Sequence, residues 1–343
     1  LALEKVGIDM VHIIGPDTAH KIHPDSKIII EEKMDSLARV GRERVPATIH
    51  LVAYTLKYNR MAWVTLDAMQ EEWKQAHIDA RLLSGNRVEV KTENVTAFTL
   101  KMAAGESPLD MTQPVTVQVD GMKLEAPRPM SDRSWEVSFH KSGDGWQVGP
   151  ATYEPGQLVK KHNLQGPIDD AFMDSFLFVS PSGTCASPTV DKWVKSEMQH
   201  AVVHWRQQFR GDARVMKDVE ITDKEIASSN LVLWGDPQSN QLIKKIAAKL
   251  PIQWTADTII VGDKEYPADH HAPILIFPNP LNPEKYVVLN SGFTYREYAY
   301  LNNARQVPML PDWAIIDLRT PPGSQYPGKV VDANFFDEFW RLK

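Results

Sequence analysis

The chain has 343 residues, 43% of them hydrophobic and 24% charged, which is the composition of an ordered protein large enough for two or three domains. Its formal net charge of −6 argues against a nucleic-acid-binding protein or a binder of anionic membranes, because both classes need a basic face. The sequence contains no run of 18 apolar residues, so it predicts no membrane span.

Neither the cysteine content nor the start of the chain identifies a cellular compartment. Cys185 has no second cysteine with which to form an internal disulfide. The chain begins at Leu1 without an initiator methionine and without a leader in which a charged segment precedes an apolar one. We therefore expect a processed product or a segment of a longer polypeptide, and we predict no localisation from these residues.

Residues 1–44 are the first predicted region, with one strand and one helix. The apolar residues within 11–14 predict the strand, and the helix begins at an N-cap that we place at Asp25 or Ser26. The apolar side of the helix consists of Ile28, Ile29, Met34, Leu37 and Val40. One strand and one helix cannot form a core, so we expect another part of the protein to cover them.

The loop between this strand and helix carries His20 and His23. A strand, a histidine loop and a helix, in this order, are how an α/β-hydrolase presents its general base, the last member of its Ser, Asp, His sequence. His20 is the preferred candidate because it lies closer to the end of the strand. Asp17 and Asp25 are poor candidates for the carboxylate that orients the ring. The alternative is that both histidines are surface residues beside the start of a helix.

A nucleophilic serine is not predicted in this chain. The G-x-S-x-G motif of a nucleophile elbow is absent, and the serines that precede a glycine lack the glycine two positions earlier. These serines include Ser84, Ser182 and Ser291. We therefore expect no independent serine hydrolase here, and any nucleophile and acid must come from an upstream portion.

The second predicted region, residues 45–160, is rich in short strands. Its sequence alternates between apolar and polar residues over several segments separated by turn signals, such as Asp120-Gly121 and Ser142–Gly145. The predicted strands are 48–54, 87–90, 95–100, 115–119, 135–139 and 146–148. Many short antiparallel strands at this spacing predict a β-sandwich-like domain or an open barrel.

The third predicted region, residues 161–343, is an α/β domain. Two of its apolar segments have no polar face, which is typical of a sheet covered by helices on both faces. The predicted helices are 188–210 and 240–250, and the predicted strands are 231–234, 258–261, 273–277 and 286–289. Overall, the fold class is mixed α/β and β, with several domains.

The segment Leu231–Asn240 predicts a strand, a tight turn and a helix. Such a turn exposes backbone N–H groups at a helix N-terminus and can hold an anion, which makes Gly235, Asp236 and Ser239 weak ligand-binding candidates. The segment has neither G-x-G-x-x-G nor a P-loop lysine. The simpler alternative is an ordinary β–α connection with no ligand.

Several histidine and aspartate clusters resemble metal sites in their spacing, but the sequence predicts no metal and no cofactor. His200 and His204 have the i, i+4 spacing of metal ligands, but H-E-x-x-H is absent and boundary residues of a helix are the simpler interpretation. Asp269-His270-His271 precedes a strand, so a metal-dependent hydrolase using His270 or His271 is kept as a third hypothesis. Calcium at Asp169, Asp170 and Asp174 lacks the D-x-D-x-D-G loop.

The chain resembles the C-terminal half of a group of large bacterial proteins identified as prolyl-oligopeptidase-type (S9) serine peptidases or esterases. The resemblance covers nearly the whole chain. It rests on the segments GIDMVHIIGPDTAHKIHPDS, LQGPIDDAFMDSFLFV, HWRQQFRGDARV, SNLVLWGDPQSN and HHAPILIFPNPLNPEKYVVLNSGFTYREY.

This resemblance implies that residues 1–44 end an α/β-hydrolase domain, with His20 as the triad histidine and His23 as runner-up. The partners it implies are an upstream portion that carries the serine and aspartate, and a peptide or ester substrate. The full-length protein would then be bacterial, and periplasmic or secreted. The alternative function is a non-catalytic module that binds a peptide, a glycan or a partner protein. The substrate, a homo-oligomeric state and the roles of residues 45–160 and 161–343 stay open.

Overall fold

The computed structural model describes residues 3–6, 10–143 and 145–343, and the chain divides into two compact units, residues 1–46 and 47–343. The protein is mixed α/β with several sheets, in line with the predicted fold class at this coarse level. No helix in the described ranges has both the length and the apolar character needed to cross a bilayer.

The first unit contains the predicted helix but not the predicted strand. Helix α1 (Pro24–Val40) follows a short 3₁₀ helix, η1 (Glu4–Val6). Residues 10–15 form no regular structure, so the strand predicted at 11–14 is wrong. A short apolar run alone does not make a strand, because a strand needs a neighbour for its backbone hydrogen bonds. Residues 7–9, which begin the segment used for the resemblance, lie outside the described residues.

The start of α1 also differs from the prediction. The N-cap is His23, neither Asp25 nor Ser26, because Pro24 takes the first helical position. The Nδ1 atom of His23 accepts a hydrogen bond from the backbone N–H of Asp25 at 3.3 Å.

The predicted apolar side of α1 is exposed to solvent, and Ser26 is its one buried residue. The exposed apolar side chains include all five that were predicted to share a face, namely Ile28, Ile29, Met34, Leu37 and Val40. The described part of the first unit therefore has no hydrophobic core of its own, as expected for a single helix and its flanking segments.

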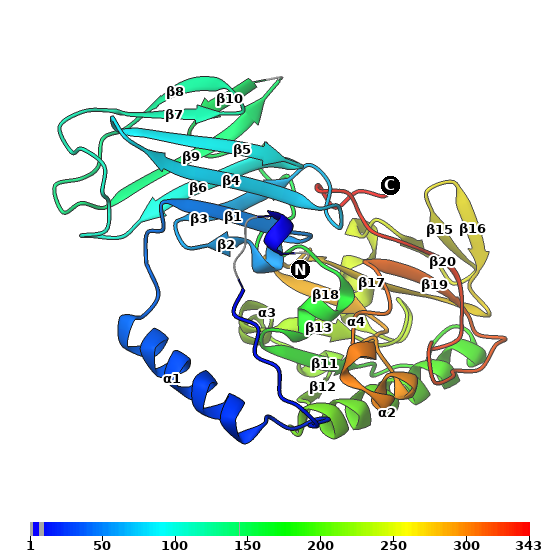
Figure 1. Ribbon diagram of the computed structural model, residues 1–343. Helices are drawn as coiled ribbons and strands as arrows, with labels where there is room; N and C mark the ends of the chain where they lie inside the picture. Colours follow the sequence, from blue (N-terminus) through cyan, green and yellow to red (C-terminus); the bar gives the residue numbers. More distant parts are fainter. Residues whose placement is uncertain (1–2, 7–9, 144) are drawn as a thin grey trace. The chain divides into compact units, whose positions relative to one another are not determined.

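The second unit begins with two five-stranded sheets (Figure 1). The first sheet has the order β1 (Thr48–Ala53), β4 (Ala76–Leu83), β5 (Arg87–Glu93), β7 (Val115–Val119) and β8 (Met122–Ala126). The second has the order β10 (Gly145–Val148), β9 (Trp135–Ser142), β6 (Val95–Met102), β3 (Val64–Met69) and β2 (Arg60–Met61). All the paired strands are antiparallel except β5 and β7, which are parallel.

These two sheets bury alternate residues, which is why the period-two pattern located many of their strands. In β1 the residues alternate between exposed and buried, starting with an exposed Thr48. Aromatic rings pack together on the buried face of the second sheet. Phe98 stacks on Phe139 at 5.0 Å between centroids, and Trp146 contacts Phe98 edge-on at 5.2 Å. The turn that was predicted to join 135–139 to 146–148 contains Asp144, which lies outside the described residues.

The rest of the second unit is built on a seven-stranded sheet. Its order is β12 (Val215–Lys217), β11 (Phe176–Ser180), β13 (Asn230–Leu233), β18 (Asn282–Leu289), β17 (His271–Asn279), β19 (Trp313–Asp317) and β20 (Lys329–Asn334). The first four are parallel, and β17, β19 and β20 add antiparallel pairs. Every residue of β17 and β19 is buried, so both faces of these strands are covered.

Three helices accompany this sheet: α2 (Pro188–Phe209), α3 (Asp223–Ser228) and α4 (Gln241–Ile246). The predicted helix 240–250 is α4 followed by a 3₁₀ turn, η5 (Ala247–Lys249). The predicted strand 258–261 is β15 (Thr258–Val261), which belongs to a separate three-stranded sheet with β14 (Gln253–Trp254) and β16 (Lys264–Pro267).

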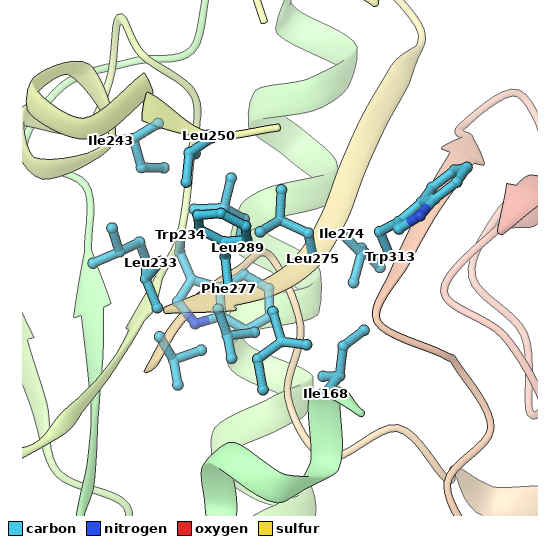
Figure 2. Close-up of a cluster of buried hydrophobic side chains, with 14 of the residues drawn as sticks. Ile168, Leu233, Trp234, Ile243, Leu250, Ile274, Leu275, Phe277, Leu289 and Trp313 are labelled. Atoms are coloured by element: carbon cyan, nitrogen blue, oxygen red, sulfur yellow. The ribbon is translucent and has the colours of Figure 1, made fainter. Parts of the chain in front are cut away.

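The hydrophobic core of this α/β part is continuous across the sheet (Figure 2). Ile243 of α4 and Leu250 lie beside Trp234 and Leu289 at the ends of the parallel strands. Burying side chains of this size is worth about 1.5–3 kcal/mol each. This core fixes the strand ends from which the polar residues described below project.

Candidate functional site

The histidine loop of the first unit leaves His20 exposed. A hydrogen bond of 3.0 Å from the Thr18 hydroxyl to the Gly15 carbonyl closes the turn that precedes it. A carboxylate oxygen of Asp25 lies 3.8 Å from the Nδ1 atom of His23, and the backbone N–H of Asp25 donates a hydrogen bond to that same atom. Within the described residues no carboxylate of this loop contacts His20.

The predicted ligand-binding residues Gly235, Asp236 and Ser239 do come together, in a buried turn after β13. The carboxylate of Asp236 accepts hydrogen bonds from the backbone N–H groups of Gln238 (3.0 Å), Ser239 (2.8 Å) and Ala186 (2.8 Å). The protein's own carboxylate therefore binds the N–H groups that an external anion would need. Helix α4 behind the turn spans only Gln241–Ile246. Asp236 therefore links the turn after β13 to the loop at Ala186.

Asn290 and Cys185 also contact this turn. The side chain of Asn290 accepts from the Gly235 N–H at 2.8 Å and donates to the Gly235 carbonyl at 3.0 Å. A Cβ atom on Gly235, whose φ is +113°, would lie 2.4 Å from the Ser239 hydroxyl oxygen. Burial raises the pKa of the Cys185 thiol to about 11, so this thiol is not a nucleophile at neutral pH.

The histidines of α2 have separate partners. The Nε2 atom of His200 lies 2.7 Å from a carboxylate oxygen of Glu297, and the Nδ1 atom of His204 lies 2.5 Å from the Tyr300 hydroxyl. Burial, and then the neighbouring His200, lower the pKa of His204 to about 4. His200 is partly exposed, as expected for a helix boundary, whereas His204 is buried.

Asp169, Asp170 and Asp174 also have separate partners. Asp169 accepts a hydrogen bond from the backbone of Thr294 at 3.0 Å, and burial raises the pKa of Asp169 to about 6. Asp170 lies 2.9 Å from the Lys57 ammonium, and Asp174 lies 2.8 Å from that of Lys285. Each carboxylate is used individually, so the three do not form a calcium loop.

A buried ionic cluster that the sequence did not reveal joins the β-rich and α/β parts of the second unit. The ammonium of Lys160 lies 2.7 Å from a carboxylate oxygen of Asp312 and 3.5 Å from one of Glu72, and all three side chains are at most 2% exposed. The ammonium also lies 5.0 Å from the centre of the Trp340 ring. Its partners come from loops far apart in the sequence.

The pKa values of this cluster follow from burial. Desolvation raises the pKa of Glu72 to about 7 even though Lys160 opposes the shift. Desolvation also raises the pKa of Asp312. Burial alone would lower the pKa of Lys160, but the two carboxylates outweigh it, so that pKa is raised.

Two cavities, of about 480 Å³ and 260 Å³, adjoin Lys160. The larger is lined by the hydrogen-bonded side chains of Asp67, Thr99 and Ser138, and the smaller by Glu72. Tyr153 lines both. Burial raises the pKa of Asp67. A pocket with convergent polar groups and shifted pKa values is a common form of a small-molecule site.

No hydroxyl or thiol of a serine, threonine or cysteine is hydrogen-bonded to a histidine ring among the described residues. The described part of the second unit therefore shows no hydrogen-bonded nucleophile–histidine pair.

The comparisons with known proteins identify no relative: no family model, no curated protein and no solved structure matches this chain.

Proposed function

We propose that this chain is the C-terminal portion of a serine hydrolase of the prolyl-oligopeptidase type. In this proposal the nucleophilic serine and the aspartate belong to an upstream portion, and His20 supplies the general base. His20 takes the proton of the serine hydroxyl during attack and then donates it to the leaving amine or alcohol. The observation that carries the proposal is the exposed His20 ring on the polar loop that precedes α1.

The different environments of the two loop histidines support His20 over His23. The ring of His23 caps α1 through its Nδ1 atom and so has a structural task. The ring of His20 is exposed and makes no hydrogen bond to a described residue, so both of its nitrogens are available. A general base needs one nitrogen for the nucleophile and the other for an orienting carboxylate.

The exposed side of α1 supports docking of the first unit on another surface. Ile28, Met34 and Leu37 are 57%, 63% and 59% exposed, although a helix of a folded domain buries its apolar side. The last helix of an α/β-hydrolase covers one face of a sheet, and such a sheet in the upstream portion would bury these residues.

The test is fluorophosphonate labelling of the native preparation, followed by intact-mass measurement of every component. A covalent adduct on a co-purifying chain is expected, and His20→Ala should abolish it. His23→Ala is the matched control: it removes a helix cap, at a cost of about 1 kcal/mol, but should leave labelling intact. Absence of an adduct and of a second chain would contradict the proposal.

One observation favours a binding module as a second candidate function. The cavities beside Lys160 belong to the second unit and combine polar with apolar lining. Short peptides and oligosaccharides could be screened by ligand-observed NMR. Ala151→Trp, at a residue that lines both cavities, should abolish binding, whereas Val148→Trp, at an exposed residue of β10, should not. Equal binding by both variants would exclude these cavities as the site.

A further inference from the structure

A cluster of potential metal ligands lies at the strand ends of the seven-stranded sheet. Strand β17 begins at His271 and strand β19 ends at Asp317, and the register of this antiparallel pair places the two residues opposite each other. Because β17 is also antiparallel to β18, the carboxyl ends of the parallel strands β13 and β18 lie on this same side of the sheet. Open α/β sheets bind their ligands outside the carboxyl ends of their parallel strands.

His270 completes the cluster. One ligand atom each from His270, His271 and Asp317 lies within 4.8 Å of the other two. His271 and Asp317 are 6% and 5% exposed, so their positions are held by packing, whereas His270 is partly accessible. Two imidazole nitrogens and one carboxylate oxygen are a donor set that suits zinc and other divalent transition metals.

Hydrogen bonds fix the tautomers of both rings in a form suited to metal binding. The Nδ1 atom of His271 lies 2.9 Å from the carbonyl oxygen of Pro267, which can only accept, so Nδ1 carries the proton. The Nδ1 atom of His270 is likewise paired with a carboxylate oxygen of Asp269. In the neutral rings the lone pair is therefore on Nε2. Metal-binding histidines characteristically donate their second nitrogen to a carbonyl or a carboxylate in this way.

The surroundings of Asp269 hold this arrangement in place. The hydroxyl of Ser187, the N-cap of α2, donates to the backbone carbonyl of Asp269 at 2.5 Å. The backbone N–H of Leu318 donates to the carbonyl of His270 at 2.9 Å. The histidine pair is thus tied both to a helix start and to the end of β19.

We propose that His270, His271 and Asp317 bind one divalent transition-metal ion of the zinc type. Three protein ligands leave at least one coordination position for water or another molecule, as in catalytic rather than structural zinc sites. In this structure the carboxylate of Asp317 accepts hydrogen bonds from Arg319, the shortest at 2.7 Å. The side chain of Arg319 is 66% exposed, so it is free to move aside when a cation takes one of the oxygens.

The test is Zn²⁺ binding by the untagged full chain, measured by isothermal titration calorimetry with metal content from mass spectrometry. One Zn²⁺ per chain is expected. His270→Ala should weaken binding at least tenfold. Arg319→Ala should tighten it severalfold, because the cation that competes for Asp317 is removed. With Co²⁺ in place of Zn²⁺, visible d–d absorption of a four-coordinate site is expected for the wild type and not for His270→Ala.

His200→Ala is the matched control, since His200 is a partly exposed histidine that pairs with Glu297 elsewhere on the chain. It should leave the affinity unchanged. Circular dichroism spectra of the metal-free variants show whether each one is folded. Equal Zn²⁺ affinity of the wild type and folded His270→Ala, or no Zn²⁺ binding at all, would overturn the proposal. Unchanged Zn²⁺ affinity of a folded Asp317→Asn variant would remove Asp317 from the ligand set.

Discussion

Glu72 holds its proton more tightly in the folded protein than in the unfolded chain. Burial raises its pKa from 4.5 to about 7, so between these pH values the folded state binds more protons than the unfolded state. The free energy of unfolding contributed by this group is therefore present below pH 4.5 and falls as pH rises towards 7. The buried Lys160 and Asp312 belong to the same cluster, so this pH dependence acts where the β-rich and α/β parts of the second unit meet.

Replacing Glu72 by Gln should change this pH dependence. Because Gln does not ionise, Glu72→Gln should become more stable relative to the wild type as pH rises from 5 to 8. Urea unfolding at a series of pH values measures this difference. The control is Glu71→Gln, a partly exposed neighbour whose pKa is lowered from 4.5 by its hydrogen bond with Lys74, so its stability relative to the wild type should not change with pH between 5 and 8. Parallel stability curves for Glu72→Gln and the wild type would contradict the prediction.

Removing the buried cation should be far more damaging than removing its neighbour. Lys160→Met leaves Asp312 buried without its closest ion-pair partner, at an expected cost of about 3–5 kcal/mol in the free energy of unfolding. Lys161→Met breaks only an exposed pair with Glu284 and should cost about 0–1 kcal/mol. Urea unfolding at pH 7 compares the two, and a similar small effect for both would show that the cluster does not depend on Lys160.

At the scale of elements, helix α2 packs directly on the backbone that follows β18. A Cβ atom at Gly292 would lie 2.6 Å from the Cβ atom of Ala201 and 3.2 Å from its Cα atom. Helix backbone cannot move aside as a flexible side chain can. The sequence therefore needs glycine at this position for the helix to approach the sheet.

Gly292→Ala should destabilise the protein by about 1–3 kcal/mol through this overlap. Gly323→Ala, where a Cβ atom meets nothing within 4 Å, should stay within about 0.5 kcal/mol of the wild type. Thermal unfolding gives both values. Ala201→Gly in the Gly292→Ala background should recover part of the loss, and a purely additive double variant would argue against the contact.

Elements with strong local signals were predictable, and those formed by their neighbours were not. The alternation in β1, β6 and β7 and the Ser187 cap of α2 are local features. Strand β4, with the sequence AHIDARLL, and β8, with MKLEA, contain residues of low strand propensity and exist through pairing with the adjacent strands. The apolar residues within 11–14 had the pattern of a strand but lack a partner strand in the described structure.

The candidate sites show the same limit. The sequence indicated His270 and His271 but not Asp317, because β19 was not predicted and the register of the sheet creates the proximity. Lys160 is 88 positions from Glu72 and 152 from Asp312, so no local spacing reveals that cluster. The Gly235 turn was recognised as a strand–turn–helix connection, but the inward position of Asp236, which binds the N–H groups itself, depends on the loop at Ala186.

At the scale of the whole molecule, the two units should differ greatly in local stability. The amides of α1 are expected to exchange with solvent near their intrinsic rates, because the helix buries only Ser26. The amides of β17 and β18, central strands of the seven-stranded sheet, should be the slowest. Hydrogen exchange followed by mass spectrometry of the isolated chain tests this. Protection of α1 equal to that of β17 would contradict the exposed position of its apolar side.

The first unit has no aromatic side chain that absorbs or fluoresces in the near ultraviolet. Residues 1–46 contain no Trp, Tyr or Phe, whereas Trp63, Trp135, Trp234 and Trp340 are fully buried in the second unit. Intrinsic fluorescence and near-ultraviolet circular dichroism therefore follow the second unit alone and would miss any event at the histidine loop. A single tryptophan introduced at exposed Leu37 would give the first unit its own emission, whose shift to shorter wavelength would report the moment α1 is covered by a partner.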